Sequence, residues 1–181
     1  WVGSVLENVE ATNIRKTAPV RLVKGSHMIV PHIYEAEHAY IFQNADGRVL
    51  FAIPFEGRFT LIGTTEVPHT GDPDTAEASD EEVEYLCKSA SQYFKTPISE
   101  AQIVRTFAGI RPLFDDSSAN SISAMTRDYV FDLVGDPGEA LLLNIFGGKL
   151  TTSRRLAERA LDTLREPLGF SSEAWTADAH L

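Results

Sequence analysis

The chain has 181 residues, of which 43% are hydrophobic and 23% are charged, and its formal net charge is −10. This composition is ordinary for a globular domain and excludes collagen-like, coiled-coil and disordered chains, and no apolar run reaches the roughly 20 residues of a membrane-spanning helix. The acidic charge argues against a protein that binds nucleic-acid phosphates, because such surfaces need a basic excess. A small anionic substrate remains compatible, since it needs only a few local cations.

Short β-type runs follow a polar connecting segment at residues 1–19. The runs lie at residues 21–24, 27–30, 39–43, 48–53 and 59–65. The first two are joined through Gly25 and Ser26, where we expect a turn, and residues 44–47 (Asn-Ala-Asp-Gly) are a hairpin signal between the third and fourth runs. Connections this short leave no room for a parallel crossover, so the pattern predicts an antiparallel meander.

The clearest helix start in the sequence is Ser79 with Glu82 three residues later, which is the pattern of a capping box. Apolar residues then recur at helical spacing up to Phe94, and Pro97 ends the pattern. The acidic stretch from residue 72 to residue 84 is expected to form solvated faces and caps. Cys87 lies on the apolar stripe and is expected to be buried; as a single cysteine it forms neither an internal disulfide nor a zinc site, which favours a cytoplasmic setting.

Three further strands are predicted at residues 103–111, 127–133 and 140–146. The last runs into Gly147 and Gly148 and then into a second helix, which Pro167 is expected to end. The fold class is therefore α+β: a mostly antiparallel sheet with a backing helix, and a terminal strand–Gly-Gly–helix unit.

Residues 146–152 (Phe-Gly-Gly-Lys-Leu-Thr-Thr) are the sharpest candidate for binding chemistry. Paired glycines between a strand and a helix let the backbone approach a ligand and aim helix N–H groups at an anion or a polarised carbonyl. The segment is not a Walker loop, because the first glycine of that motif is missing and Leu150 replaces its Ser or Thr. The alternative is an ordinary turn at the end of a strand.

Two arginines and a histidine are the other candidates. Arg111 precedes Pro112 at an expected strand end, where a guanidinium suits the bidentate grip of a phosphate or carboxylate, or pairs with a surface carboxylate. Arg127 is followed by Asp128, so a structural ion pair is equally compatible. His27 could accept a proton near neutral pH, or be a hydrogen-bonded structural histidine. No histidine has partners at metal-ligand spacing, so no metal site is expected.

Five blocks occur in the same order as in a known family, at residues 24–31, 62–67, 109–113, 126–129 and 146–152. Together they resemble the middle section of FAD-dependent glycerol-3-phosphate dehydrogenase, a quinone-linked enzyme similar to the D-amino-acid-oxidase-type flavoproteins. The resemblance implies that the chain is a central fragment, without the half that carries the G-x-G-x-x-G segment for the FAD pyrophosphate. Such a fragment is expected to be inactive by itself and not to hold FAD, since most of the cofactor's contacts would come from the missing half.

The resemblance also implies a division of the chain. Residues 1–19 would connect from the missing half of the FAD domain, and residues 20–139 would form the substrate-binding sheet. Residues 140–166 would be the return strand and helix of the FAD domain, and residues 167–181 would begin a C-terminal domain.

The resemblance implies roles for the candidate residues in oxidising sn-glycerol 3-phosphate to dihydroxyacetone phosphate. His27 and Arg111 would be catalytic, with Arg111 and Arg127 binding the substrate. The residues toward the flavin would be Gly147, Gly148, Lys149, Leu150 and Thr151. The helix start and Lys149 would stabilise negative charge on the reduced ring.

Other functions stay open at this point. A glycerol-phosphate oxidase or another flavin oxidoreductase of the same fold would pass electrons to oxygen or elsewhere instead of to quinone. A non-catalytic binding domain is the alternative from another class. For the full-length protein, the family's quinone partner implies the inner face of the cell membrane as an alternative to a purely cytoplasmic setting.

Overall fold

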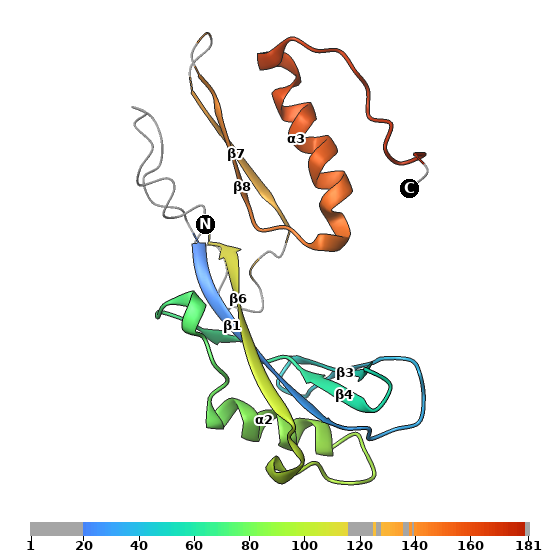
Figure 1. Ribbon diagram of the computed structural model, residues 1–181. Helices are drawn as coiled ribbons and strands as arrows, with labels where there is room; N and C mark the ends of the chain where they lie inside the picture. Colours follow the sequence, from blue (N-terminus) through green and yellow to red (C-terminus); the bar gives the residue numbers. More distant parts are fainter. Residues whose placement is uncertain (1–19, 116–124, 126–127, 136–137, 139, 180–181) are drawn as a thin grey trace. The chain divides into compact units, whose positions relative to one another are not determined.

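The computed structural model describes residues 20–115, 125, 128–135, 138 and 140–179 (Figure 1). The predicted connecting segment at residues 1–19 and the candidate Arg127 lie outside this part of the chain. The described residues divide into two compact units. We call residues 22–111 the sheet unit, and residues 20–21 together with those from 112 onward the hairpin unit; each is described by itself.

A six-stranded sheet is the main element of the fold. Its strands are β1 (Val20–Pro31), β2 (Tyr40–Gln43), β3 (Val49–Phe55), β4 (Phe59–Gly63), β5 (Val67–Pro68) and β6 (Arg105–Phe114). The order is β2-β3-β4-β1-β5, with β6 also paired to β1, and the β2-β3, β3-β4, β4-β1 and β1-β5 pairs are antiparallel. The predicted meander and α+β class are confirmed.

Two of the expected strand boundaries are wrong. β1 runs without interruption through Gly25 and Ser26, where a turn was expected, and β6 continues past Arg111 and Pro112 instead of ending there. Pro112 is accommodated because, among the described strands, β6 pairs with β1 alone, and a proline without an N–H fits the unpaired side of such an edge strand.

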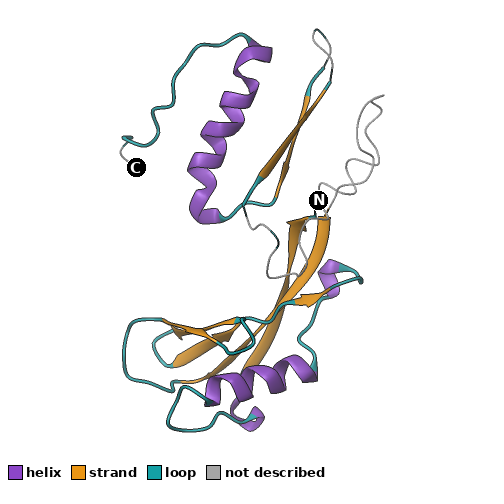
Figure 2. Cartoon of the chain, turned by 180° about the vertical axis from the view of Figure 1, so that it is seen from behind, coloured by secondary structure: helices purple, strands orange, loops and turns teal. Residues whose placement is uncertain are grey.

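Helix α2 (Asp80–Ser91) covers one face of the sheet (Figures 1 and 2). Ser79 and Glu82 form the predicted capping box. The core between helix and sheet consists of buried apolar side chains: Met28, Val30, Leu50, Ile62, Leu86, Cys87, Ala90 and Ile98. Cys87 is buried as predicted, its Sγ lies 3.8 Å from the Met28 sulfur, and desolvation by burial raises the pKa of its thiol. Short 3₁₀ turns flank α2 at Pro73–Thr75 and Glu100–Gln102.

The hairpin unit contains an antiparallel pair, β7 (Val130–Val134) and β8 (Leu142–Phe146), then the 3₁₀ turn η4 (Leu150–Thr152) and helix α3 (Ser153–Leu168). The predicted strand–glycine–helix order is confirmed, but the expected helix end is wrong. Pro167 lies inside the last turn of α3, and the helix is capped by Gly169, which has a φ of 67°. The N–H of Gly169 donates to the Glu166 carbonyl, and the N–H of Phe170 donates to the Arg165 carbonyl.

The described residues contain neither a membrane-spanning helix nor a cluster of metal-binding side chains. None of their helices has both the length and the apolar character needed to cross a membrane. In the same part of the chain, histidine, cysteine and carboxylate side chains do not gather in groups of three or more that could hold a metal ion.

Candidate functional site

The sheet unit brings the candidate residues His27 and Arg111 onto one face of β1. Side chains alternate along a strand, so Lys24, Ser26 and Met28 turn toward α2 while residues 25, 27 and 29 turn to the other face. A Cβ built on Gly25 would lie 2.4 Å from Arg111 Nη1, so the guanidinium occupies the space that a side chain at position 25 would take. Arg111 reaches from β6 across β1 to the same face as His27.

Arg111 is held from the other side of β1 as well. Its Nη2 donates a hydrogen bond of 2.9 Å to the hydroxyl of Thr64, the residue that follows β4. The guanidinium is therefore placed by three strands: β6 carries it, β1 leaves room for it through Gly25, and the end of β4 binds it. An arginine fixed in this way keeps a planar set of N–H donors in a constant direction.

A second glycine makes room for the imidazole of His27. Gly63 lies opposite His27 in the β1–β4 register, and a Cβ built on it would come within 2.1 Å of the His27 ring. Phe107 of β6 stacks on the imidazole with 5.0 Å between ring centroids and 6° between ring planes. Neither Gly25 nor Gly63 adopts a positive φ, so the reason for glycine at both positions is space and not backbone conformation.

The surroundings of His27 keep its imidazole neutral at physiological pH. Desolvation by burial is the main cause that lowers its pKa below the usual 6.5, and the positive charge of Arg111 acts in the same direction, with the Gly25 backbone opposing them. A neutral imidazole is the form that accepts a proton. The pair thus combines a proton acceptor with a fixed cation.

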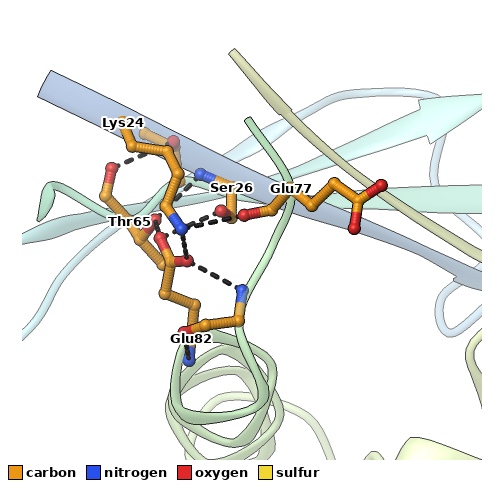
Figure 3. A network of polar contacts seen from close by, with 7 residues as sticks. Lys24, Ser26, Thr65, Glu77 and Glu82 are labelled. Carbon is orange, nitrogen blue, oxygen red and sulfur yellow. Dashed lines mark hydrogen bonds and ion pairs between the residues drawn. The ribbon is translucent and has the colours of Figure 1, made fainter. Parts of the chain in front are cut away.

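Behind this face lies a buried polar network that the sequence did not indicate (Figure 3). Glu82 Oε2 lies 2.7 Å from Lys24 Nζ, and Glu82 Oε1 accepts hydrogen bonds from Ser26 Oγ (2.9 Å) and Thr65 Oγ1 (2.6 Å). Lys24 also donates to the carbonyl of Glu77 at 2.8 Å. Within the acidic stretch, which was expected to form solvated faces and caps, Glu82 does form a cap but is not solvated, since it is 5% exposed.

The charge of Glu82 is strongly stabilised in the folded protein. Desolvation, the largest single effect, would raise its pKa, but the hydrogen bonds from Lys24, the Ser79 backbone, Thr65 and Ser26 together outweigh it and lower the pKa to about 2. The capping-box pattern was the one available signal for this residue. The Lys24 contact had none, because it joins residues far apart in the sequence.

The predicted flavin-binding segment lies in the hairpin unit. Gly147 and Gly148 have φ values of 73° and 103°, a region that favours glycine. At Gly147 the close neighbour is the Asp128 carbonyl, 3.0 Å from a Cβ built there. Residues 147–151 are exposed, and Thr152, which precedes α3, makes no side-chain cap. An exposed backbone turn that leads into a helix start without a side-chain cap fits a polarised carbonyl group such as those of a flavin ring.

Comparison with known proteins identifies the class. The sequence pattern of the FAD dependent oxidoreductase (DAO) family matches residues 1–154, and the chain belongs to this family. The predicted family and the FAD dependence of the class are therefore confirmed.

Curated relatives match all or most of this chain. The chain is 46% identical to glycerol-3-phosphate dehydrogenase of Pseudomonas aeruginosa and 45% identical to D-erythritol 1-phosphate dehydrogenase of Brucella abortus, in each case over 100% of this chain and 35% of the relative. It is 44% identical to aerobic glycerol-3-phosphate dehydrogenase of Escherichia coli K12, over 90% of this chain and 32% of that protein.

A solved structure also resembles this one. It is the glycerol-3-phosphate dehydrogenase from Bacillus halodurans complexed with FAD, with a TM-score of 0.65 and 28% identity over 87% of this chain and 29% of that one. The chain thus spans about a third of the length of the relatives it matches.

Proposed function

We propose that the chain is the substrate-binding sheet and the closing strand–helix segment of an FAD-dependent dehydrogenase that oxidises glycerol 3-phosphate to dihydroxyacetone phosphate. One structural observation carries the proposal: the imidazole of His27 and the guanidinium of Arg111 share one face of β1, each in a space left by a glycine. The names of the relatives that cover this chain support the substrate.

In this proposal Arg111 binds the phosphate or orients the carbon that reacts, and Arg127 supports the phosphate. His27 accepts the proton of the C2 hydroxyl as that carbon becomes a carbonyl. FAD, when bound, supplies the acceptor for the hydride that leaves C2. Stacking on Phe107 and contact with Gly63 keep the imidazole in one orientation, which is what a proton acceptor needs in order to meet a bound hydroxyl.

The residues proposed to face the flavin are Gly147, Gly148, Lys149, Leu150 and Thr151. They are exposed, and Lys149 adds a positive charge beside the helix start. The positive charge of Lys149 and the helix start both favour negative charge on a neighbouring ring.

The proposal extends to the rest of the parent protein. Residues 20–139 would form its substrate domain and residues 140–166 would complete its FAD domain, with the tail at 167–181 starting a further domain. Quinone is the proposed electron acceptor, which would bring the full-length protein to the inner face of the cell membrane.

The test is a substrate assay on the full-length protein. We expect reduction of a quinone or dye with glycerol 3-phosphate and no reduction with unphosphorylated glycerol. Absence of activity with every phosphate ester would contradict an enzymatic role and favour a binding domain. Hydrogen peroxide formed in step with substrate, without any dye, would favour an oxidase.

D-erythritol 1-phosphate is a second candidate substrate, because the relative named for that activity is nearly as similar as those named for glycerol 3-phosphate. Both compounds are phosphate monoesters of polyols, and one proton acceptor with one guanidinium serves either. The ratio of kcat/KM for the two substrates, measured on the same preparation, decides between them.

A further inference from the structure

Glu82 makes more contacts than a helix cap requires. A capping box needs only one bond to the carboxylate, from the Ser79 N–H, and Glu82 Oε2 accepts that bond at 3.0 Å. The other oxygen, Oε1, accepts from Ser26 and Thr65, and Lys24 adds an ion pair with 14% of its side chain exposed. A buried ion pair gives little net stability compared with apolar side chains of similar size, so stability alone is a weak reason for this arrangement.

Glu82 Oε1 binds Ser26 on β1 and Thr65 in the segment that follows β4, and each of these residues is adjacent in sequence to a residue of the candidate site. Ser26 precedes His27, and Thr65 follows Thr64, whose hydroxyl binds Arg111. β1 and the segment after β4 are also bonded to each other. The Ser26 N–H donates to Thr65 Oγ1 at 2.8 Å, and the Thr65 N–H donates to the Ser26 carbonyl at 3.3 Å.

The ion pair of Glu82 with Lys24 also holds a residue that is adjacent in sequence to the candidate site. Lys24 precedes Gly25, the residue over which the guanidinium lies. Neighbouring residues of a strand share their backbone but point to opposite faces, so a bond that fixes one also fixes the direction of the next. The Glu82 carboxylate, on the helix side of the sheet, therefore fixes the backbone segments that carry the candidate site on the other side.

We propose that Glu82 is a positioning residue, which fixes His27 and Arg111 from the opposite face of the sheet. It acts through the residues that it binds on β1 and in the segment after β4. The inference rests on the proposed function, because it assigns Glu82 a part in the same site.

The experiment uses the full-length enzyme with the substitutions Glu82→Gln and Thr65→Val. Gln keeps the size of the side chain but leaves Lys24 without its counter-charge, and Val keeps the shape of Thr65 but removes the hydroxyl that joins Ser26 to Glu82. Asn44→Ala is the matched control, because Asn44 is also buried and bonds to Tyr85 on α2 and to Tyr93 just beyond it, away from the site.

We expect KM for the polyol phosphate to rise about tenfold or more in both network variants, since small displacements of binding groups have effects of this order or larger. KM for the electron acceptor should stay unchanged. A KM does not depend on the fraction of folded enzyme, so a purely structural role would lower Tm and the apparent kcat and leave KM as in Asn44→Ala. That outcome would overturn the proposal, and either variant suffices if the other does not fold.

A crystal structure of the Glu82→Gln protein gives a readout that does not depend on activity. The hydrogen bond between Arg111 Nη2 and Thr64 Oγ1, 2.9 Å in the present structure, should be broken. An unchanged bond with unchanged His27 and Arg111 rotamers would refute the positioning role. If the wild-type enzyme oxidises no polyol phosphate, the proposed function fails while this structural comparison still decides on Glu82.

Discussion

At Gly25 and Gly63 the backbone leaves space that two side chains of the candidate site fill. The guanidinium of Arg111 and the imidazole of His27 occupy the volume that a Cβ at these positions would take, so each side chain depends on glycine for its position. Packing in a protein interior is dense enough that one methyl group displaces its neighbours. The two glycines therefore belong to the site as much as the side chains that they accommodate.

Substitution Gly25→Ala tests this directly. The new methyl group would overlap the Arg111 guanidinium and force it from its position, so we expect KM for the phosphate substrate to rise by about tenfold or more. Gly109→Ala is the matched control, because Gly109 lies on β6 two residues before Arg111 and a Cβ there meets nothing within 4 Å. Steady-state kinetics on both variants give the answer, and equal KM values would contradict the steric role of Gly25.

The lowered pKa of His27 predicts how kcat/KM changes at acidic pH. Because the pKa of His27 in the folded protein lies below 6.5, the imidazole stays neutral as the pH falls through 6.5, and kcat/KM should decline only at lower pH. His27→Gln should remove this decline and lower kcat by about 10²-fold to 10⁴-fold. A profile of the same shape in that variant would assign the proton acceptor to another group.

At the scale of elements, helix α2 is where the sequence was most informative. The capping box and the apolar stripe with Cys87 were predicted from local spacing, and both are present. The ion pair between Glu82 and Lys24 was not, since it depends on which strand lies beside the helix start. Local patterns encode where α2 begins but not which strand lies beside it.

The same limit explains the wrong boundaries. Gly25 and Pro112 have the local signature of turns, but Gly25 lies inside β1 to admit Arg111 and Pro112 lies on an edge strand. Pro167 has the signature of a helix stop, but Gly169 ends α3. His27 and Arg111 themselves were found through their sequence blocks, whereas the glycines, Thr64 and Phe107 that place them became evident only from strand pairing.

The low pKa of Glu82 predicts how the helix layer responds to acid. The pKa is about 2 in the folded protein and near 4.5 when unfolded, so its contribution is complete above about pH 4.5 and is lost as the pH falls toward 2. A shift of this size corresponds to roughly 3 kcal/mol in the free energy of unfolding. Melting temperatures of wild type and Glu82→Gln should differ at neutral pH and converge as the pH falls toward 2, and a constant difference would contradict the assignment.

At the scale of the whole molecule, the chain is a family member that spans about a third of its relatives' length. Of the residues proposed for substrate, His27 and Arg111 lie in the sheet unit, and the residues proposed for flavin lie in the hairpin unit. A cofactor as large as FAD needs more contacts than one glycine segment and one helix start provide.

We therefore expect the isolated 181-residue chain not to retain FAD. Mixed with FAD and passed through gel filtration, it should elute without flavin absorbance, whereas the full-length protein should elute with it. Stoichiometric flavin bound to the isolated chain would show that residues 147–151 and their surroundings bind the cofactor by themselves.

The buried position of Cys87 provides a reporter of motion in this chain. The thiol is the only one in the sequence and lies in the core between α2 and the sheet, beside Met28. An alkylating reagent in solution reaches it only when the helix separates from the strands. The rate of covalent labelling thus reports the opening of the layer between α2 and the sheet, without any engineered probe. A faster rate in Glu82→Gln would show that this layer opens more readily when the Glu82 network is broken.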